Sequence, residues 1–125
     1  MTEDPGSQRI AAVVVTFNRL DLLRDLVDVL VKVPDLDEVL VVDNASQDGT
    51  PQIAADYPAA HVIANRENQG FGRACNQGAR AALGEVLVFL NPDVFVTPDW
   101  LSILVRRIAE PVSYTHLTLP TNREV

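Results

Sequence analysis

The chain has 125 residues, the length of one domain or of part of one. Its composition, 47% hydrophobic and 22% charged, is that of an ordinary globular protein and excludes a disordered or fibrous chain. The formal net charge of −7 argues against a nucleic-acid partner, because phosphate binding needs clustered basic side chains. The single cysteine, Cys75, excludes an internal disulfide, and we expect its thiol to be buried and inert.

Both ends of the chain differ from the region between them. Residues 1–9 are polar and lack the apolar segment of a signal peptide, so we expect a flexible tail there. We expect a cytoplasmic protein. For a longer parent protein, a location at the inner face of the membrane is the alternative. Residues 112–125 do not continue the apolar periodicity, and "VSYTHLTLPT" resembles a translated sequencing-adapter end. We interpret them as a non-native tail, with a native irregular extension as the alternative.

Residues 10–111 alternate between apolar runs and helical patterns. Apolar runs without alternation are typical of strands that are covered on both faces. The four predicted strands are Ile10–Thr16, Glu38–Asp43, His61–Glu67 and Glu85–Leu90. A helix is predicted after each strand: from Leu20, from a Thr50 N-cap with Pro51 in the first turn, after Gly70, and from Thr97. This order predicts an α/β fold with a mostly parallel sheet and helices on both faces.

Polar residues gather where these strands end. They are Thr16, Asn18, Asp43, Asn44, Asn65, Asn91 and Asp93. Parallel sheets bind ligands at the carboxyl ends of their strands, at the point where the strand order reverses. Each residue alone has a second reading as a turn or cap residue, so the clustering is the functional signal.

Phosphate-binding signatures narrow the choice of ligand. The turn after the first predicted strand, "TFNRLD", has no glycine, which excludes the dinucleotide fingerprint. The "GFG" at Gly70–Gly72 follows the third strand. Glycine there permits either close approach of a ligand or a tight loop that leads into a helix, and the loop alone does not decide between them.

Four stretches together resemble the nucleotide-binding half of a family 2 glycosyltransferase with the GT-A fold. They are "VVVTFNR" at 13–19, "VVDNASQDGT" at 41–50, "NQGFGRACNQG" at 68–78 and "FLNPDV" at 89–94, and they follow the family's order and spacing. The resemblance implies a truncated, Rossmann-like donor-binding half of an inverting transferase over residues 10–111. "LNPDV" is similar to rhamnosyltransferase-like members, which use a dTDP- or UDP-sugar donor. The implied acceptor is a glycan or a lipid-linked saccharide.

The resemblance also assigns roles to individual residues. Asp43 would accept a hydrogen bond from the base or the ribose, in a pocket lined by Thr16 and Asn18. The implied donor-binding set is Thr16, Asn18, Asp43, Asn44, Gly70, Arg73, Asn76 and Asn91. Two of these residues have an alternative role: Asn44 as a residue that only shapes its turn, and Arg73 as one half of a salt bridge.

Asn91-Pro92-Asp93 occupies the position of the family's DxD-type metal motif. The resemblance implies a divalent cation, Mg²⁺ or Mn²⁺, bound by Asp93, and hard cations of this kind prefer oxygen ligands. Asn91 replaces the first carboxylate, so it would hydrogen-bond the ribose without adding charge. The alternative is an ordinary turn at the end of a strand.

Inverting transfer needs a general base for the acceptor hydroxyl. The family supplies it from the acceptor-binding half, so no catalytic residue is assigned in this chain, and we expect the fragment to bind donor without transferring sugar. The competing class is a non-catalytic α/β module, regulatory or nucleotide-binding, such as a receiver-like domain. The "TFNR" end of the first strand and a single lysine, Lys32 in the first helix, disfavour a receiver-like domain. We expect Trp100 to pack in the core and His61 to bind no metal.

Overall fold

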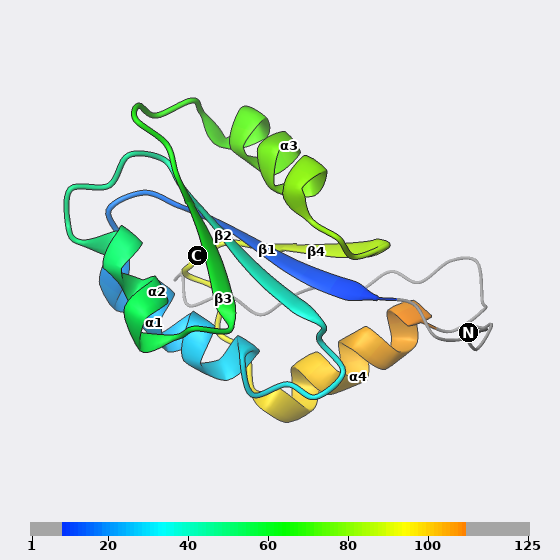
Figure 1. Cartoon of the computed structure of the whole chain (residues 1–125). Helices are drawn as coiled ribbons and strands as arrows, with labels where there is room; N and C mark the ends of the chain where they lie inside the picture. The colour runs from blue at the N-terminus through cyan, green and yellow to red at the C-terminus, as the bar shows by residue number, and fades with distance from the viewer. Residues whose placement is uncertain (1–8, 110–125) are drawn as a thin grey trace, which may run out of the picture.

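The computed structural model describes residues 9–109. Strands and helices alternate along them (Figure 1), as the apolar periodicity predicts. The strands are β1 (Ile10–Thr16), β2 (Glu38–Asp43), β3 (Ala60–Ala64) and β4 (Val86–Leu90). The helices are α1 (Leu20–Leu30), the single 3-10 turn η1 (Thr50–Gln52), α2 (Ile53–Asp56), α3 (Phe71–Ala81) and α4 (Pro98–Ala109).

The four strands form one parallel sheet in the order β3-β2-β1-β4. Every residue of β1 is buried, because this strand is central and both of its faces are covered. The chain order reverses at β1, which has β2 on one side and β4 on the other. The parallel sheet with helices on both faces is the predicted Rossmann-like arrangement, and its switch point lies at β1.

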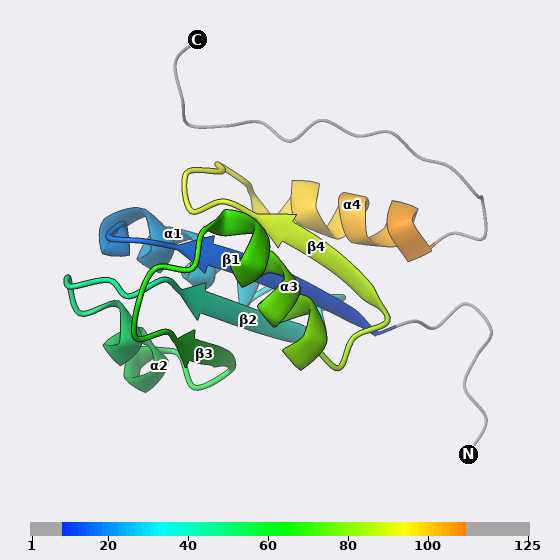
Figure 2. The ribbon, with the colours of Figure 1, turned by 90° about the horizontal axis from the view of Figure 1, so that it is seen from above.

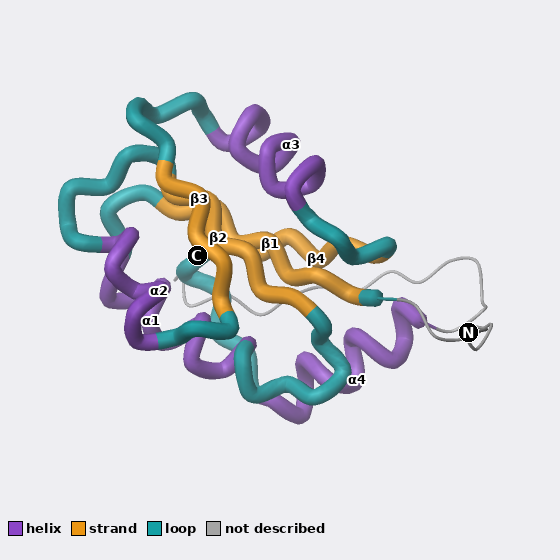
Figure 3. Tube along the Cα trace, in the orientation of Figure 1, coloured by secondary structure: helices purple, strands orange, loops and turns teal. Residues whose placement is uncertain are grey.

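Helices cover the two faces of the sheet unequally. Figures 1 and 2 show α3 on one face and α1, α2 and α4 on the other, and Figure 3 shows the sheet as one layer between them. The larger apolar core lies on the three-helix face, where Leu23, Val27 and Leu30 of α1 pack against the sheet. On the other face, Ala74 of α3 packs against Val13, Val15 and Val42.

Helix α3 lies unusually close to the sheet because its inner face has small side chains. A Cβ atom at Gly78 would lie 2.5 Å from Cγ1 of Val13 and 3.2 Å from Cγ2 of Val42. The single cysteine, Cys75, is half-buried beside this contact, and burial raises the pKa of its thiol. No helix in residues 9–109 is long and apolar enough to cross a membrane.

Several predicted boundaries differ from the structure. Strand β3 begins at Ala60 rather than His61, and β4 begins at Val86 rather than Glu85. Strand β3 ends at Ala64 rather than Glu67, because the chain turns once the Asn65 N–H has donated to the Asp43 carbonyl over 2.9 Å. Thr50 begins a 3-10 turn whose N-cap is Gly49, so the predicted Thr50 N-cap is wrong. The N-cap position has a φ of 85°, which glycine adopts without strain, and Gly49 occupies it. The Thr50 hydroxyl instead donates to Asp48 over 2.5 Å.

Candidate functional site

The carboxyl ends of β1, β2 and β4 meet at one edge of the sheet. Thr16 is paired with Asp43 across β1 and β2, and Val14 is paired with Leu90 across β1 and β4. Residues that follow these strands are therefore neighbours, although they lie far apart in the sequence.

The loops after β1 and β2 are tied together by Asn18. The Asn18 N–H donates to the Ser46 hydroxyl over 2.7 Å, and the Gln47 N–H donates to the Asn18 side-chain oxygen over 2.8 Å. Asn18 and Ala45 both have positive φ, 51° and 69°, a conformation that asparagine tolerates better than most residues. In the structure, the predicted donor ligand Asn18 therefore also shapes the two loops.

Asp48 caps α1 from the other loop. Arg19, at the N-cap position, gives no side-chain cap, and the Leu20 N–H donates instead to the Asp48 carboxylate over 2.9 Å. Thr50 donates to the second Asp48 oxygen through its N–H over 3.2 Å. Partial loss of hydration around its carboxylate raises the pKa of Asp48, but the hydrogen bonds from Thr50 and Leu20 outweigh this effect, so that pKa is lowered.

Two of the predicted ligands are buried at the ends of their strands. Asp43 is 1% exposed, and its carboxylate accepts hydrogen bonds from the Ser46 N–H, over 3.2 and 3.3 Å, and from the Ser46 hydroxyl. Thr16 is 2% exposed, and its hydroxyl has no hydrogen-bond partner within residues 9–109. A buried hydroxyl without a partner is rare in native proteins, so a ligand or a water molecule at this edge would remove a free-energy cost.

An open hollow of about 270 Å³ lies between the end of β1 and the start of α3. It is lined by Val15, Thr16, Phe17, Asn44, Asn68, Gly70 and Phe71. Three of the predicted donor-binding residues, Thr16, Asn44 and Gly70, are therefore brought together around one space. The aromatic side chains of Phe17 and Phe71 are 47% and 57% exposed beside it.

A network of side-chain amides holds the wall of this hollow. The Asn44 side-chain oxygen accepts from the Asn65 amide over 3.1 Å and from the Gln69 N–H over 3.3 Å. Its amide nitrogen donates to the Gly70 carbonyl over 3.2 Å. Asn65 and Gln77 exchange two further hydrogen bonds of 2.9 Å each. Asn44 thus makes the hydrogen bonds of a residue that shapes its loops, which is the alternative to a direct contact with the donor.

Two predicted ligands lie on the outer surface of α3. Arg73 and Asn76 are both exposed and are not among the residues that line the hollow. The ion pairs found among the described residues use Arg19, Arg24, Lys32 and Arg106, so they do not support a salt bridge of Arg73. Contact of Arg73 or Asn76 with a donor remains a prediction.

The segment after β4 carries the predicted metal motif. The Val94 N–H donates to the Asn91 carbonyl over 3.1 Å, which closes a turn with Asn91 exposed and Asp93 half-buried. Val94 and Val96 anchor the turn because both are buried in the larger core. Asp93 is therefore presented at the same edge of the sheet as Thr16.

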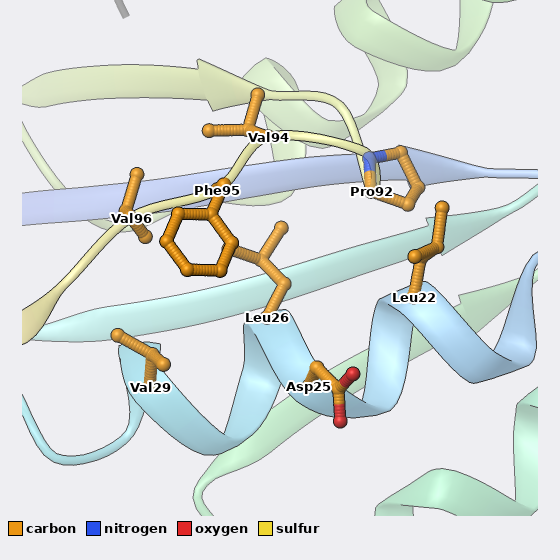
Figure 4. Close-up of a pocket in the computed structure, with 8 residues that line it drawn as sticks. All are labelled: Leu22, Asp25, Leu26, Val29, Pro92, Val94, Phe95 and Val96. Carbon is orange, nitrogen blue, oxygen red and sulfur yellow. The ribbon is translucent and has the colours of Figure 1, made fainter. Parts of the chain in front are cut away.

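A second hollow, of about 140 Å³, lies between this segment and α1 (Figure 4). Phe95 and Val96 line it on one side, and Leu26 and Val29 of α1 line it on the other. Its single carboxylate, Asp25, makes it unsuited to a phosphorylated ligand. Pro92 of the predicted metal motif lines this hollow together with Leu22 of α1.

The residues at this edge suit a hard cation with an incomplete set of protein ligands. No group of three or more His, Cys, Asp or Glu residues in the described part of the chain could hold a metal ion. Both carboxylate oxygens of Asp43 accept hydrogen bonds from Ser46, whereas Asp93 and Asn91 follow β4 at the same end of the sheet and bring further side-chain oxygens there. Mg²⁺ and Mn²⁺ accept such a set, because they retain waters or take phosphate oxygens.

Several site residues were not predicted. Phe17 and Phe71 line the hollow, and the signal for them was an apolar aromatic side chain inside each of two otherwise polar loops. The sequence around Gln77 gave no signal of its role, because its hydrogen bonds to Asn65 depend on how α3 packs on the sheet. His61 lies at the opposite end of the strands, beside Glu38, and the Trp100 side chain lies outside the described part of the structure.

A parallel sheet with a polar cluster and an open hollow at its switch point defines a ligand-binding protein of the doubly wound α/β class. The chain belongs to glycosyl transferase family 2, whose family model matches residues 11–122. Membership of this family decides against the receiver-like alternative.

Individual relatives agree with the family match. The chain is 41% identical over 68 residues to the glycosyltransferase AglE of Haloferax volcanii, covering 51% of this chain and 22% of AglE. It is 36% identical over 101 residues to the succinoglycan biosynthesis protein ExoO of Rhizobium meliloti, covering 78% of this chain and 29% of ExoO. The chain thus spans less than a third of either relative.

A solved structure gives the same result for the fold. The mannosyltransferase PcManGT from Pyrobaculum calidifontis, in complex with GDP-Man and Mn²⁺, superposes with a TM-score of 0.72 and 31% identity. The match covers 88% of this chain and 35% of PcManGT. The predicted family and the predicted fold are both confirmed.

Proposed function

We propose that this chain forms the donor-binding part of a glycosyltransferase that uses a nucleoside-diphosphate sugar. The observation that carries the proposal is the hollow beside β1, because it brings Thr16, Asn44 and Gly70 together at the switch point of a family 2 sheet. The likeness to PcManGT, a structure that contains GDP-Man and Mn²⁺, supports this choice of ligand.

The nucleoside would lie in the hollow. Phe17 and Phe71 offer exposed aromatic surface on which a base can stack, and such stacking contributes about 1–3 kcal/mol in other proteins. The Thr16 hydroxyl lacks a partner in the described structure and would gain one from a ribose or base oxygen. Asn18, Asp43, Arg73, Asn76 and Asn91 complete the proposed donor-binding set.

The diphosphate would lie toward the end of β4. We assign Asp93 as the ligand of a Mg²⁺ or Mn²⁺ ion, which neutralises the diphosphate when bound. With one carboxylate from the protein, the cation would take the rest of its ligands from phosphate oxygens and water. Metal and nucleotide are therefore expected to bind together, each strengthening the other.

We propose that the whole reaction uses residues beyond the described part of this chain. In inverting transfer, an acceptor hydroxyl attacks the anomeric carbon, the bond to the diphosphate breaks, and a general base takes the hydroxyl proton. We assign no such base in this chain, and we propose that it belongs to an acceptor-binding half in a longer parent protein. Rhamnose as the sugar, dTDP or UDP as the carrier, and a glycan or lipid-linked saccharide as the acceptor remain proposals that rest on the "LNPDV" resemblance.

Nucleotide titration tests the donor site. We expect calorimetry with UDP, dTDP and GDP to show binding of at least one diphosphate, stronger with Mn²⁺ than without it. The Asp93→Ala variant should lose the effect of Mn²⁺, and Phe17→Ala should weaken binding about tenfold with or without metal. Glu85→Ala is the control, since it removes one carboxylate at the opposite edge of the sheet. If no diphosphate binds even with metal, the proposal is wrong.

Inactivity of the fragment is tested separately. We expect no sugar transfer from any of the three donor types to an acceptor, because we assign no general base among residues 9–109. Detectable transfer by this chain alone would contradict that part of the proposal while leaving the donor site intact.

A further inference from the structure

The wall of the hollow at the start of α3 is held by Asn44, which lines the hollow, and behind it by Asn65 and Gln77, which do not. Gly70 has φ 85° and ψ 163°, a conformation that is accessible almost only to glycine. A Cβ atom at Gly70 would meet nothing within 4 Å, so packing around this residue does not fix the loop. The contacts that do fix it are polar.

Asn44 provides the direct contacts. It is 3% exposed at the end of β2, and its amide bonds both the Gln69 N–H and the Gly70 carbonyl. The same carbonyl accepts the Ala74 N–H over 3.2 Å in the first turn of α3. The orientation of the Asn44 amide therefore sets the position of the first turn of the helix.

Asn65 and Gln77 fix the Asn44 amide in turn. Asn65 donates to the Asn44 side-chain oxygen, which leaves the Asn44 nitrogen free to donate to Gly70. Gln77 holds Asn65 through two hydrogen bonds and connects the end of β3 to the middle of α3. Because α3 faces the sheet with the small residues Ala74 and Gly78, it has few interlocking side chains to fix it along its own axis.

We propose that Asn65 and Gln77 are positioning residues for nucleotide binding. Acting through Asn44, they keep Gly70 and Phe71 at the distance from β1 that the base and ribose need. The inference rests on the proposed donor site, but it concerns two residues that are not among those lining the hollow.

The test compares Gln77→Met with Gln52→Met. Methionine has a similar size to glutamine and cannot form either hydrogen bond to Asn65, while Gln52 is an exposed glutamine in η1 that serves as the matched control. Amide hydrogen exchange, measured by NMR without ligand, should be at least fivefold faster at Gln69 and Ala74 in Gln77→Met. Exchange in β1, which reports global unfolding, should be unchanged. Gln77→Glu keeps an acceptor for Asn65 and should give an intermediate rate.

The second readout is nucleotide affinity with Mn²⁺. Loss of two hydrogen bonds predicts a Kd for the best-binding diphosphate that is roughly fivefold to tenfold weaker in Gln77→Met and unchanged in Gln52→Met. Equal affinity for wild type and Gln77→Met, or unchanged exchange at Gln69 and Ala74, would overturn the positioning role. That outcome is distinct from failure of the proposed function, in which the wild-type chain itself would bind no diphosphate.

Discussion

Asp48 stabilises two segments with one carboxylate, the start of α1 and the turn at Thr50. Its pKa is lowered, so the folded state binds this proton more weakly than the unfolded state does. The resulting stabilisation is complete above the unfolded pKa and is lost as the pH falls below about 3.9.

We therefore predict that Asp48→Asn lowers the free energy of unfolding at pH 7 and that this difference shrinks between about pH 4 and pH 3. Because Asp48 is exposed, the loss at pH 7 should not exceed roughly 1 kcal/mol. Urea titrations at pH 7, 5, 4 and 3 measure it, with Asp25→Asn on the exposed face of α1 as control. A difference that stays constant over this range would contradict the assignment.

Cys75 gives a residue-scale prediction with a simple readout, because it is the only thiol in the chain. Burial raises its pKa, so at pH 8 less of it is thiolate than in a free cysteine. We expect the native protein to react with a disulfide reagent several-fold more slowly than the urea-unfolded protein at the same pH. Equal rates in the two states would show that the thiol is not protected.

At the scale of elements, α3 offers a paired test of helix packing. Gly78→Ala would force a Cβ atom to within 2.5 Å of Cγ1 of Val13. Overpacking should exceed the gain in helix propensity and lower the free energy of unfolding by about 1–2 kcal/mol. Gly72→Ala is the control in the same helix, because its Cβ would meet nothing within 4 Å. We expect no loss there, and urea midpoints with equal m-values would measure both.

The elements themselves were predictable because their patterns are local. Ile10–Thr16 is an unbroken apolar run, and a central strand covered on both faces needs one. Contacts with a partner that is distant in the sequence were not predictable. Asp37 illustrates this: its carboxylate accepts the Ile10 N–H over 2.7 Å across 27 residues. Nothing near Asp37 in the sequence indicates that contact.

The candidate site follows the same division. The position of Thr16 and Asn44 at strand ends was predictable from the sequence, because the carboxyl ends of parallel strands lie side by side. The hydrogen bonds from Asn18 to Ser46 and from Asn65 to Gln77 were not predictable, since they depend on loop conformation and on how α3 packs on the sheet. The outward position of Arg73 and Asn76 likewise depends on the rotation of that helix.

At the scale of the whole molecule, the interpretation of residues 112–125 as non-native leads to a deletion experiment. We expect a chain ending at Pro111 to have a free energy of unfolding within about 0.5 kcal/mol of the full chain, the range of a neutral surface change. Its affinity for the best-binding diphosphate should also be unchanged. A loss larger than this in either quantity would favour the native-extension alternative.

The central place of β1 also governs how the chain folds. Its first residue, Ile10, is paired with Val86, a partner 76 positions later in the sequence (86 − 10 = 76). Bringing such distant segments together costs loop-closure entropy before any contact compensates for it, which makes parallel sheets slow to form. During synthesis, β1 leaves the ribosome before the other three strands but gains its second neighbour only after β4 has emerged. The strand at the centre of the native core is therefore among the last to be enclosed.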